Sequence, residues 1–354
     1  MILLGCTGSI GVNALKIAKK FNISVEVLVA GKNVNLLNEQ IKIHNPKTVV
    51  VANETDITKV NHSNIYAGQE NILKVIEDST SELVVNALVG FLGLSPTLKA
   101  IECGKKVALA NKESLVACGK FIDSSKIQPI DSEHFGLWYL MQNRPVEKMI
   151  ITASGGAFRD WDINRLQNAT LADTLKHPNW SMGQKITIDS ATMVNKMFEL
   201  VEARWLFGEG QYDAIIETKS LIHALIDFKD GSTTAHFADA NMQLPIAYAV
   251  NKKMDEKILS NVDLLKVGSL EFREIDKLRY PIWEIKEDLL KNPNRGVIVN
   301  AANEMAIEKF INKEIGFMDI SKTIVNMYKT YEHEPKNIDD VFAIDNDIRK
   351  IMRR

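Results

Sequence analysis

The first third of the chain alternates between short apolar runs and longer amphipathic stretches. The β-branched runs, which we expect to be strands, span residues 1–4, 25–30, 48–52, 83–88 and 106–110. Between most of them, apolar residues recur at helical spacing, over residues 12–21, 34–43 and 70–77. Strands that alternate with helices are typical of a parallel sheet with helices on its faces. We therefore expect an α/β domain over residues 1–130.

The pattern changes after residue 148. Short apolar runs predict strands at residues 149–154, 185–189, 215–220 and 233–238, and residues 193–207 predict one long helix. This mixture predicts an α+β domain over residues 131–252. Charged, helix-like segments then follow at residues 256–266, 287–293, 301–314 and 320–331. They predict a connecting segment over 253–280 and an all-α domain over 281–354.

Composition narrows the class of protein. The net charge of −2 creates no overall field that would favour nucleic acid or an anionic membrane. The three cysteines, Cys6, Cys103 and Cys118, form no CxxC motif, which argues against a disulfide framework or a thiolate zinc site. We therefore expect the protein in the reducing cytoplasm. The longest uncharged run, 83–98, is broken by Asn, Gly and Pro, so we expect no membrane span and no leader peptide ahead of the first strand.

The segment GCTGSIG at residues 5–11 follows the first predicted strand and opens a helix. Glycines there allow a tight turn, and the free N–H groups of a helix N-terminus bind pyrophosphate, so a dinucleotide site is favoured over a plain turn. The second strand ends in Gly31, Lys32 and Asn33 instead of the acidic residue typical of NAD sites. A lysine attracts a 2′-phosphate, which favours NADPH, although Lys32 in a solvated turn remains an alternative.

Polar residues follow three further predicted strands, at 111–113, 131–133 and 152–156. Ligands of open α/β sheets bind at the carboxyl ends of strands, so these clusters together predict a site, although each alone could be a helix cap. Lys112 is a candidate to hold a substrate oxygen, and Ser154 with two glycines to bind an anion. For each of them a solvent-facing turn residue is the alternative.

The helix expected at 193–207 carries a possible third carboxylate, with Thr192 as its expected N-cap. Asn195, Glu199 and Glu202 share one face, which could simply be exposed to solvent. Alternatively, Glu199 joins Asp131 and Glu133 in a site for Mg²⁺ or Mn²⁺, which prefer oxygen ligands.

The segment KHPNWSMGQK at 176–185 has the composition of a loop and carries His177 and Trp180. It predicts either a mobile lid over a substrate or a rigid loop anchored by a buried tryptophan.

These motifs together resemble one enzyme family. GCTGSIG, LVAGKN, ALANKESLV, PIDSEHF, TASGGAFR, KHPNWSMGQKITIDSATMVNK and EARWLF occur in this order, and the likeness extends through residues 227–249 and 300–310. The chain is similar to 1-deoxy-D-xylulose 5-phosphate reductoisomerases. The resemblance implies a cytoplasmic homodimer that rearranges this phosphorylated sugar by retro-aldol and aldol steps. It then reduces the aldehyde with NADPH to 2-C-methyl-D-erythritol 4-phosphate, in non-mevalonate isoprenoid synthesis.

The resemblance also assigns roles to residues. It implies that the metal ligands are Asp131, Glu133 and Glu199. Those expected to contact the reacting part of the substrate are Lys112, Ser132 and Glu133. Those expected to bind the phosphate end are Ser154, Ser190, Asn195 and Lys196. His177 is expected to reach the substrate from the flap, and Trp180 to cover it. Those expected to line the NADPH site are Thr7, Gly8, Ser9, Ile10, Gly31, Lys32, Asn33, Asn111, Glu113 and Gly183.

Some positions depart from the family pattern: Cys6, Ala157, Gln184 and the pair Met197–Phe198. Cys6 predicts a cofactor loop sensitive to thiol reagents, and Gln184 bears on the flap and cofactor contacts. Two other functions stay open on the residues alone. One is a metal-free NADP-dependent dehydrogenase, which needs no carboxylate cluster, and the other is a non-catalytic NADPH-binding sensor. Roles for Glu202 and His223 are not assigned.

Overall fold

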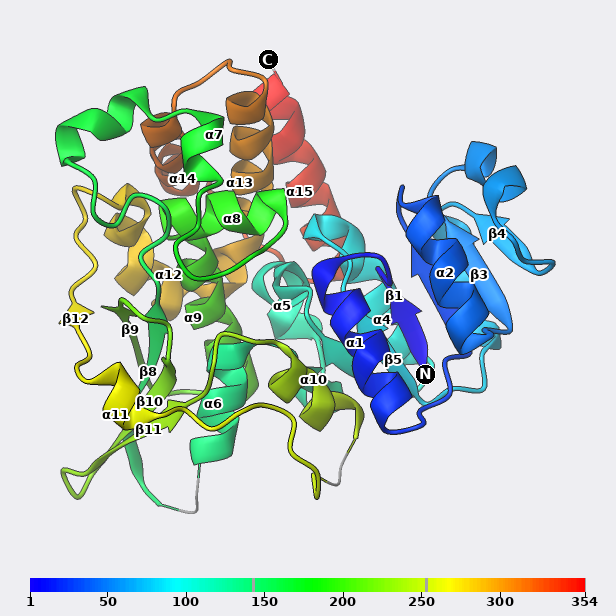
Figure 1. Cartoon of the computed structure of the whole chain (residues 1–354). Helices are drawn as coiled ribbons and strands as arrows, with labels where there is room; N and C mark the ends of the chain where they lie inside the picture. Colours follow the sequence, from blue (N-terminus) through cyan, green and yellow to red (C-terminus); the bar gives the residue numbers. More distant parts are fainter. Residues whose placement is uncertain (142–143, 252–253, 354) are drawn as a thin grey trace. The chain divides into compact units, whose positions relative to one another are not determined.

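A computed structural model of the chain describes residues 1–141, 144–251 and 254–353 and divides it into two compact units (Figure 1). The first unit comprises Met1–Ser114, Asp123–Ser132 and Asn241–Leu259. The second comprises Leu115–Ile122, Glu133–Ala240 and the chain from Ser260 onward. Among the described residues, no helix has both the length and the apolar character needed to cross a membrane.

The first unit is built on a parallel sheet of seven strands in the order β4-β3-β2-β1-β5-β6-β7. The strands are β1 (Ile2–Leu4), β2 (Val27–Ala30), β3 (Thr48–Val51), β4 (Ile65–Ala67), β5 (Leu83–Asn86), β6 (Lys106–Leu109) and β7 (Ile127–Pro129). The order reverses beside β1, which pairs with both β2 and β5. Such a reversal is where open α/β sheets bind ligands. The predicted α/β fold is confirmed, although the short edge strand β4 was not predicted.

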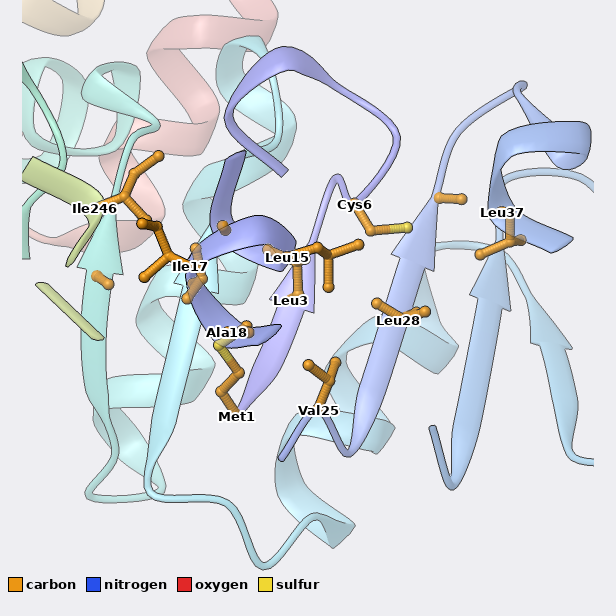
Figure 2. Close-up of a cluster of buried hydrophobic side chains, with 14 of the residues drawn as sticks. Met1, Leu3, Cys6, Leu15, Ile17, Ala18, Val25, Leu28, Leu37 and Ile246 are labelled. Atoms are coloured by element: carbon orange, nitrogen blue, oxygen red, sulfur yellow. The ribbon is translucent and has the colours of Figure 1, made fainter. Parts of the chain in front are cut away.

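Helices pack against this sheet, and its inner strands β1 and β2 are therefore buried at every position. The helices are α1 (Ser9–Lys20), α2 (Val34–His44), α3 (Gln69–Asp78) and α4 (Leu94–Glu102). In Figure 2, Leu3 and Leu28 of the sheet lie beside Leu15 of α1. Ile246 of α10 (Gln243–Val250) belongs to the same core, so a late segment of the chain packs against α1.

The second unit contains a mixed sheet of five strands in the order β11-β10-β8-β9-β12. They are β8 (Val146–Ala153), β9 (Gln211–Glu217), β10 (Ile222–Phe228), β11 (Thr233–Phe237) and β12 (Phe272–Arg273). β8 and β9 run parallel, and the other neighbours are antiparallel. The α+β character predicted for this region is confirmed, and β10 is an additional strand.

The strand expected at residues 185–189 is wrong, because these residues belong to α8 (Gln184–Thr192). The run Lys-Ile-Thr-Ile-Asp alternates like a strand. Five residues are too few, however, to distinguish the two-residue period of a strand from the 3.6-residue period of a helix. On the helix, Lys185 and Asp189 are one turn apart and form an ion pair of 2.8 Å.

The expected long helix is confirmed as α9 (Val194–Phe207), but its expected N-cap is wrong. Met193 occupies the cap in the left-handed conformation, with a φ of 68°, and it is the only residue between α8 and α9. Thr192 ends α8, and its hydroxyl donates to the carbonyls of Ile188 and Asp189.

The C-terminal region is helical, as predicted. Its helices are α12 (Lys286–Lys291), α13 (Gly296–Ile311), α14 (Phe317–Thr330) and α15 (Ile338–Arg353), of which α15 was not predicted. α13 is almost wholly buried and packs against α14 and α15 (Figure 1). The helix expected at 256–266 is wrong apart from its end, α11 (Leu264–Val267), because Ile258 packs against the core of the first unit from a non-helical segment.

Candidate functional site

The three predicted metal-binding carboxylates come together. Asp131 follows β7, Glu133 lies in the first turn of α6 (Ser132–Leu140), and Glu199 lies in α9. One carboxylate oxygen of each lies within 4.8 Å of the others. Glu199 is only 1% exposed, so the alternative that its helix face points to solvent is wrong. A cluster of oxygen donors without sulfur or imidazole fits a hard divalent cation such as Mg²⁺ or Mn²⁺.

Two lysines balance this negative charge. The ammonium of Lys112, at the start of α5 (Lys112–Cys118), lies 3.0 Å from Asp131 Oδ2. That of Lys196 lies 3.1 Å from Glu133 Oε1 and also contacts Glu199 Oε2. Asn195 Nδ2 donates to Glu199 Oε1 at 2.5 Å. The structure therefore places Asn195 and Lys196, which the resemblance assigns to the phosphate end, against the carboxylates.

His134 and Glu202 form a buried pair that was not predicted to be functional, and it connects α6 with α9. His134 is fully buried on α6, and its Nε2 lies 2.8 Å from the backbone oxygen of Glu199. Its Nδ1 lies 3.3 Å from Glu202 Oε2. His134 therefore links α6 to α9 directly beside Glu133 and Glu199. In the sequence, the only indication of a role for His134 is its position immediately after Glu133.

His177 forms the centre of a second polar cluster in the second unit. Its Nε2 lies 2.8 Å from Ser154 Oγ, just after β8, and 3.2 Å from Ser190 Oγ on α8. Its Nδ1 accepts the backbone N–H groups of Asn179 and Trp180 at 3.1 and 2.9 Å. Nδ1 therefore carries no hydrogen, and the neutral ring carries its hydrogen on Nε2. The structure brings together two residues predicted to bind the phosphate end, Ser154 and Ser190, with His177, which was predicted to reach the substrate from the flap.

Burial and charge keep this imidazole neutral. Desolvation, and secondarily the guanidinium of Arg159, lower the pKa of His177 from 6.5 to about 4. Arg159 is held near the serine, because its Nη1 donates to the carbonyls of Ser154 and Thr218 at 2.8 and 2.9 Å. His177 is therefore a neutral hydrogen-bond donor at physiological pH.

The expected flap is a loop that begins after Leu175 and ends where α8 begins. Hydrogen bonds from the side chain of Asn179 hold it in place. Asn179 Nδ2 donates to Thr218 O at 3.0 Å and to Ser220 Oγ at 2.7 Å. Trp180 is half-buried and packs edge-on against His223, with ring centroids 6.2 Å apart. His223, which sequence reasoning left unassigned, thus contacts the flap, and its Nε2 also lies 3.1 Å from Ala238 O.

The glycine-rich loop of the first unit lies at the point where the strand order reverses. Gly5 adopts a φ of +82°, and a Cβ there would lie 2.5 Å from the carbonyl oxygen of Ala87, just after β5. At Gly11 a Cβ would meet the carbonyl oxygen of Gly5 at 2.3 Å. Both glycines let the turn and the helix lie close to the strands, and α1 then begins at Ser9 with free N–H groups. The geometry fits a pyrophosphate.

The other predicted cofactor residues divide into exposed and buried groups. Gly31, Lys32 and Asn33 are exposed directly after β2, the strand beside β1. Asn33 also caps α2 by accepting from Leu36 N at 3.2 Å. Asn111 is buried, and its amide bonds the carbonyls of Leu88 and Gly90 and the carboxylate of Glu113, so its side chain shapes the loop. The second unit carries Gly183, the exposed residue that caps α8.

The expectation that Cys6 makes this loop sensitive to thiol reagents is wrong. Its side chain is fully buried in the core shown in Figure 2. Burial raises the pKa of the thiol to about 12, so the reactive thiolate is not populated. Cys6 acts as a small apolar residue in place of serine.

Comparisons with known proteins agree along the chain. The model of the 1-deoxy-D-xylulose 5-phosphate reductoisomerase family matches residues 1–119, and a model of the C-terminal domain of that enzyme matches residues 127–207. A further model, DXP reductoisomerase C-terminal domain, matches residues 237–351. Together they match parts of both compact units and leave residues 120–126 and 208–236 outside the matches.

Individual relatives carry the same name. The chain is 58% identical to 1-deoxy-D-xylulose 5-phosphate reductoisomerase of Nautilia profundicola, over 99% of this chain and 98% of the relative. It is 52% identical to that of Campylobacter lari, over 99% and 98%. The Zymomonas mobilis enzyme in complex with NADPH superimposes with a TM-score of 0.89 at 32% identity, covering 99% of this chain and 97% of that one. A DOX-P reductoisomerase with NADPH, fosmidomycin and magnesium gives 0.90 at 31% identity, covering 99% and 97%.

The neutral state of His177 predicts a residue-specific titration. ¹⁵N NMR of the histidine side chains should show a ring with its hydrogen on Nε2 that stays neutral well below pH 6. Since the folded pKa lies below the unfolded value, this group stabilises the fold fully above pH 6.5, and the contribution is lost as the pH falls toward 4. His177→Gln identifies the resonance. A ring that titrates near pH 6.5, or carries its hydrogen on Nδ1, would contradict the geometry.

Proposed function

The chain belongs to the 1-deoxy-D-xylulose 5-phosphate reductoisomerase family, and we propose that Asp131, Glu133 and Glu199 form the centre of its active site. It is an NADPH- and divalent-metal-dependent enzyme of the non-mevalonate isoprenoid pathway. It rearranges 1-deoxy-D-xylulose 5-phosphate and reduces the product to 2-C-methyl-D-erythritol 4-phosphate. The observation that supports the proposed site is the convergence of three carboxylates within 4.8 Å. A metal-free dehydrogenase would not need such a cluster of carboxylates.

The carboxylates would hold Mg²⁺ or Mn²⁺, which polarises the substrate oxygens when bound and stabilises charge that develops on them. Lys112 lies 3.0 Å from Asp131 and is 7% exposed, so its ammonium is fixed where it can donate to a substrate oxygen. Ser132, also 7% exposed, lies between Asp131 and Glu133 along the chain and supplies a hydroxyl beside the same oxygens. These groups orient the substrate and exclude water from the reacting carbons.

The phosphate end of the substrate would bind around His177. Ser154 Oγ accepts the N–H of Gly156 at 3.1 Å, and the neutral ring donates its Nε2 hydrogen to that oxygen. Both lone pairs of the hydroxyl are then used, so its own hydrogen remains to donate to an anion. Ser190, Asn195 and Lys196 complete the proposed set, and Trp180 covers the substrate from the flap.

NADPH supplies the hydride for the reduction, and we place it at the carboxyl ends of β1 and β2. Backbone groups of the glycine-rich loop would bind the pyrophosphate, at Thr7, Gly8, Ser9 and Ile10. Lys32 with its neighbours Gly31 and Asn33 would contact the ribose 2′-phosphate. Asn111, Glu113 and Gly183 would line the rest of the cofactor.

Three broader expectations are also proposed. The first is a division into a cofactor domain (1–130), a catalytic domain (131–252), a connecting segment (253–280) and a helical domain (281–354). The second is a homodimer, which rests on the family resemblance. The third is a cytoplasmic location, supported by three cysteines that are all free.

The defining experiment is NADPH oxidation, followed by its absorbance, with 1-deoxy-D-xylulose 5-phosphate and Mg²⁺ or Mn²⁺. We expect turnover that a chelator abolishes and added metal restores. Folded protein that oxidises no NADPH would refute the assignment. Activity that survives chelation would instead support a metal-free dehydrogenase.

Replacing the buried metal ligand tests the site. Glu199→Gln keeps the size of the side chain but removes its charge, and we expect turnover to fall about 100-fold or more, because even changes outside the ligands cost 10–100-fold. NADPH binding, measured by fluorescence, should be retained. Glu209→Gln, whose parent side chain is 93% exposed, is the matched control and should keep full activity. Near-native turnover of Glu199→Gln would remove this residue from the ligand set.

Replacing the lysine after β2 tests the cofactor preference. Lys32→Ala should weaken NADPH binding about tenfold, the usual cost of one charged hydrogen bond, and leave NADH binding nearly unchanged. The control is Lys74→Ala, which removes an exposed lysine from α3 of the same unit. An equal effect of Lys32→Ala on both dinucleotides would argue against a contact with the 2′-phosphate.

A further inference from the structure

Lys196 does not lie free to bind an anion. Its side chain is 5% exposed, and its ammonium contacts two carboxylates of the proposed metal site, Glu133 at 3.1 Å and Glu199. The second oxygen of Glu199 accepts from Asn195 Nδ2 at 2.5 Å. Both oxygens of Glu199 are therefore engaged by residues at the start of its own helix.

A bound divalent cation and the Lys196 ammonium would compete for the same carboxylate oxygens. A divalent cation held by Glu133 and Glu199 needs carboxylate oxygens that the Lys196 ammonium contacts. Two cations brought to the same oxygens repel each other strongly where water is excluded. A lysine has a flexible four-carbon stem, so its charged group can change partner without a change in the backbone.

We propose that Lys196 is an exchangeable counter-ion, which balances Glu133 and Glu199 until a divalent cation binds them and then transfers its ammonium to the phosphate of the substrate. The inference rests on the proposed function, which supplies the phosphate. Lys196 lies three residues beyond Met193, and Ser190, a member of the His177 cluster, lies three residues before it. The short link places the start of α9 next to the end of α8 that carries this cluster.

The exchange couples the two ligands energetically. Metal binding makes a positive charge available to phosphate, and phosphate binding removes a competitor of the metal. Because such coupling is reciprocal, each ligand should raise the affinity of the full chain for the other by the same factor. The metal also binds more weakly than the carboxylates alone would allow, because it must displace the ammonium.

The first test measures Mn²⁺ binding to the full-length protein by calorimetry or by the electron paramagnetic resonance of free Mn²⁺. Lys196→Gln should bind Mn²⁺ about tenfold more tightly than the unmodified chain, because a charge a few ångströms from the ligands is removed. The control Lys148→Gln removes a lysine that pairs with Asp213 at 2.8 Å, and should leave Mn²⁺ binding unchanged. Unchanged or weaker Mn²⁺ binding by the Lys196 variant would overturn the proposal.

The second test measures inorganic phosphate binding with and without Mn²⁺. In the unmodified chain Mn²⁺ should raise phosphate affinity several-fold, and in Lys196→Gln this factor should fall to about one, as expected when the residue that carries the coupling is removed. A factor that persists in the variant would mean that the metal contacts phosphate directly, and would refute the exchange. Lys196→Met, with an unbranched apolar stem, repeats both tests if the glutamine variant does not fold.

These outcomes are separate from those of the proposed function. An enzyme that turns over its substrate while Lys196→Gln binds Mn²⁺ no more tightly refutes only the exchange. A protein that shows the tighter Mn²⁺ binding without oxidising NADPH keeps the exchange as a property of the site and refutes the assigned reaction.

Discussion

Three carboxylates within 4.8 Å of one another in a largely buried place repel each other strongly unless positive charge accompanies them. This constraint governs the surrounding structure. Lys112 and Lys196 supply the charge from two different helices, and Asn195 adds a polar donor. If a divalent cation took the place of the Lys196 ammonium, as proposed above, Lys112 would remain beside Asp131. The site is therefore balanced in either condition, which a cluster of acids alone would not be.

In the second unit, the helix that carries Glu199 is largely buried. α9 is buried from Lys196 to Ala203, and its backbone is fixed to α6 through the ring of His134. Glu202 faces the other side of that ring. Glu133 and Glu199, two of the side chains that would hold a cation, are thus carried by helices that the ring of His134 connects. Rigid support of this kind keeps ligand oxygens in place without strain in the loops.

Much of the fold and site could be predicted because it depends on composition and order along the chain. Parallel strands have β-branched runs with helices between them, and the acids of a metal site are recognisable as residue types. The wrong strand at 185–189 arose because a five-residue alternation fits both periods, and only the Lys185–Asp189 pair distinguishes them. The direction of Lys196 and the contact between His134 and Glu202 depend on how α6 packs against α9. That packing cannot be read from either segment alone.

The single residue between α8 and α9 has a consequence for how the chain can vary in length. Met193 is 1% exposed and holds a left-handed turn, so α8 passes into α9 without a loop that could absorb a change. One inserted or deleted residue there would rotate α9 by about 100° around its axis, given 3.6 residues per turn. Glu199 would then face away from Glu133, while Ser190 would stay where it is. Insertions are tolerated in surface loops, but this joint can accept changes of side chain only.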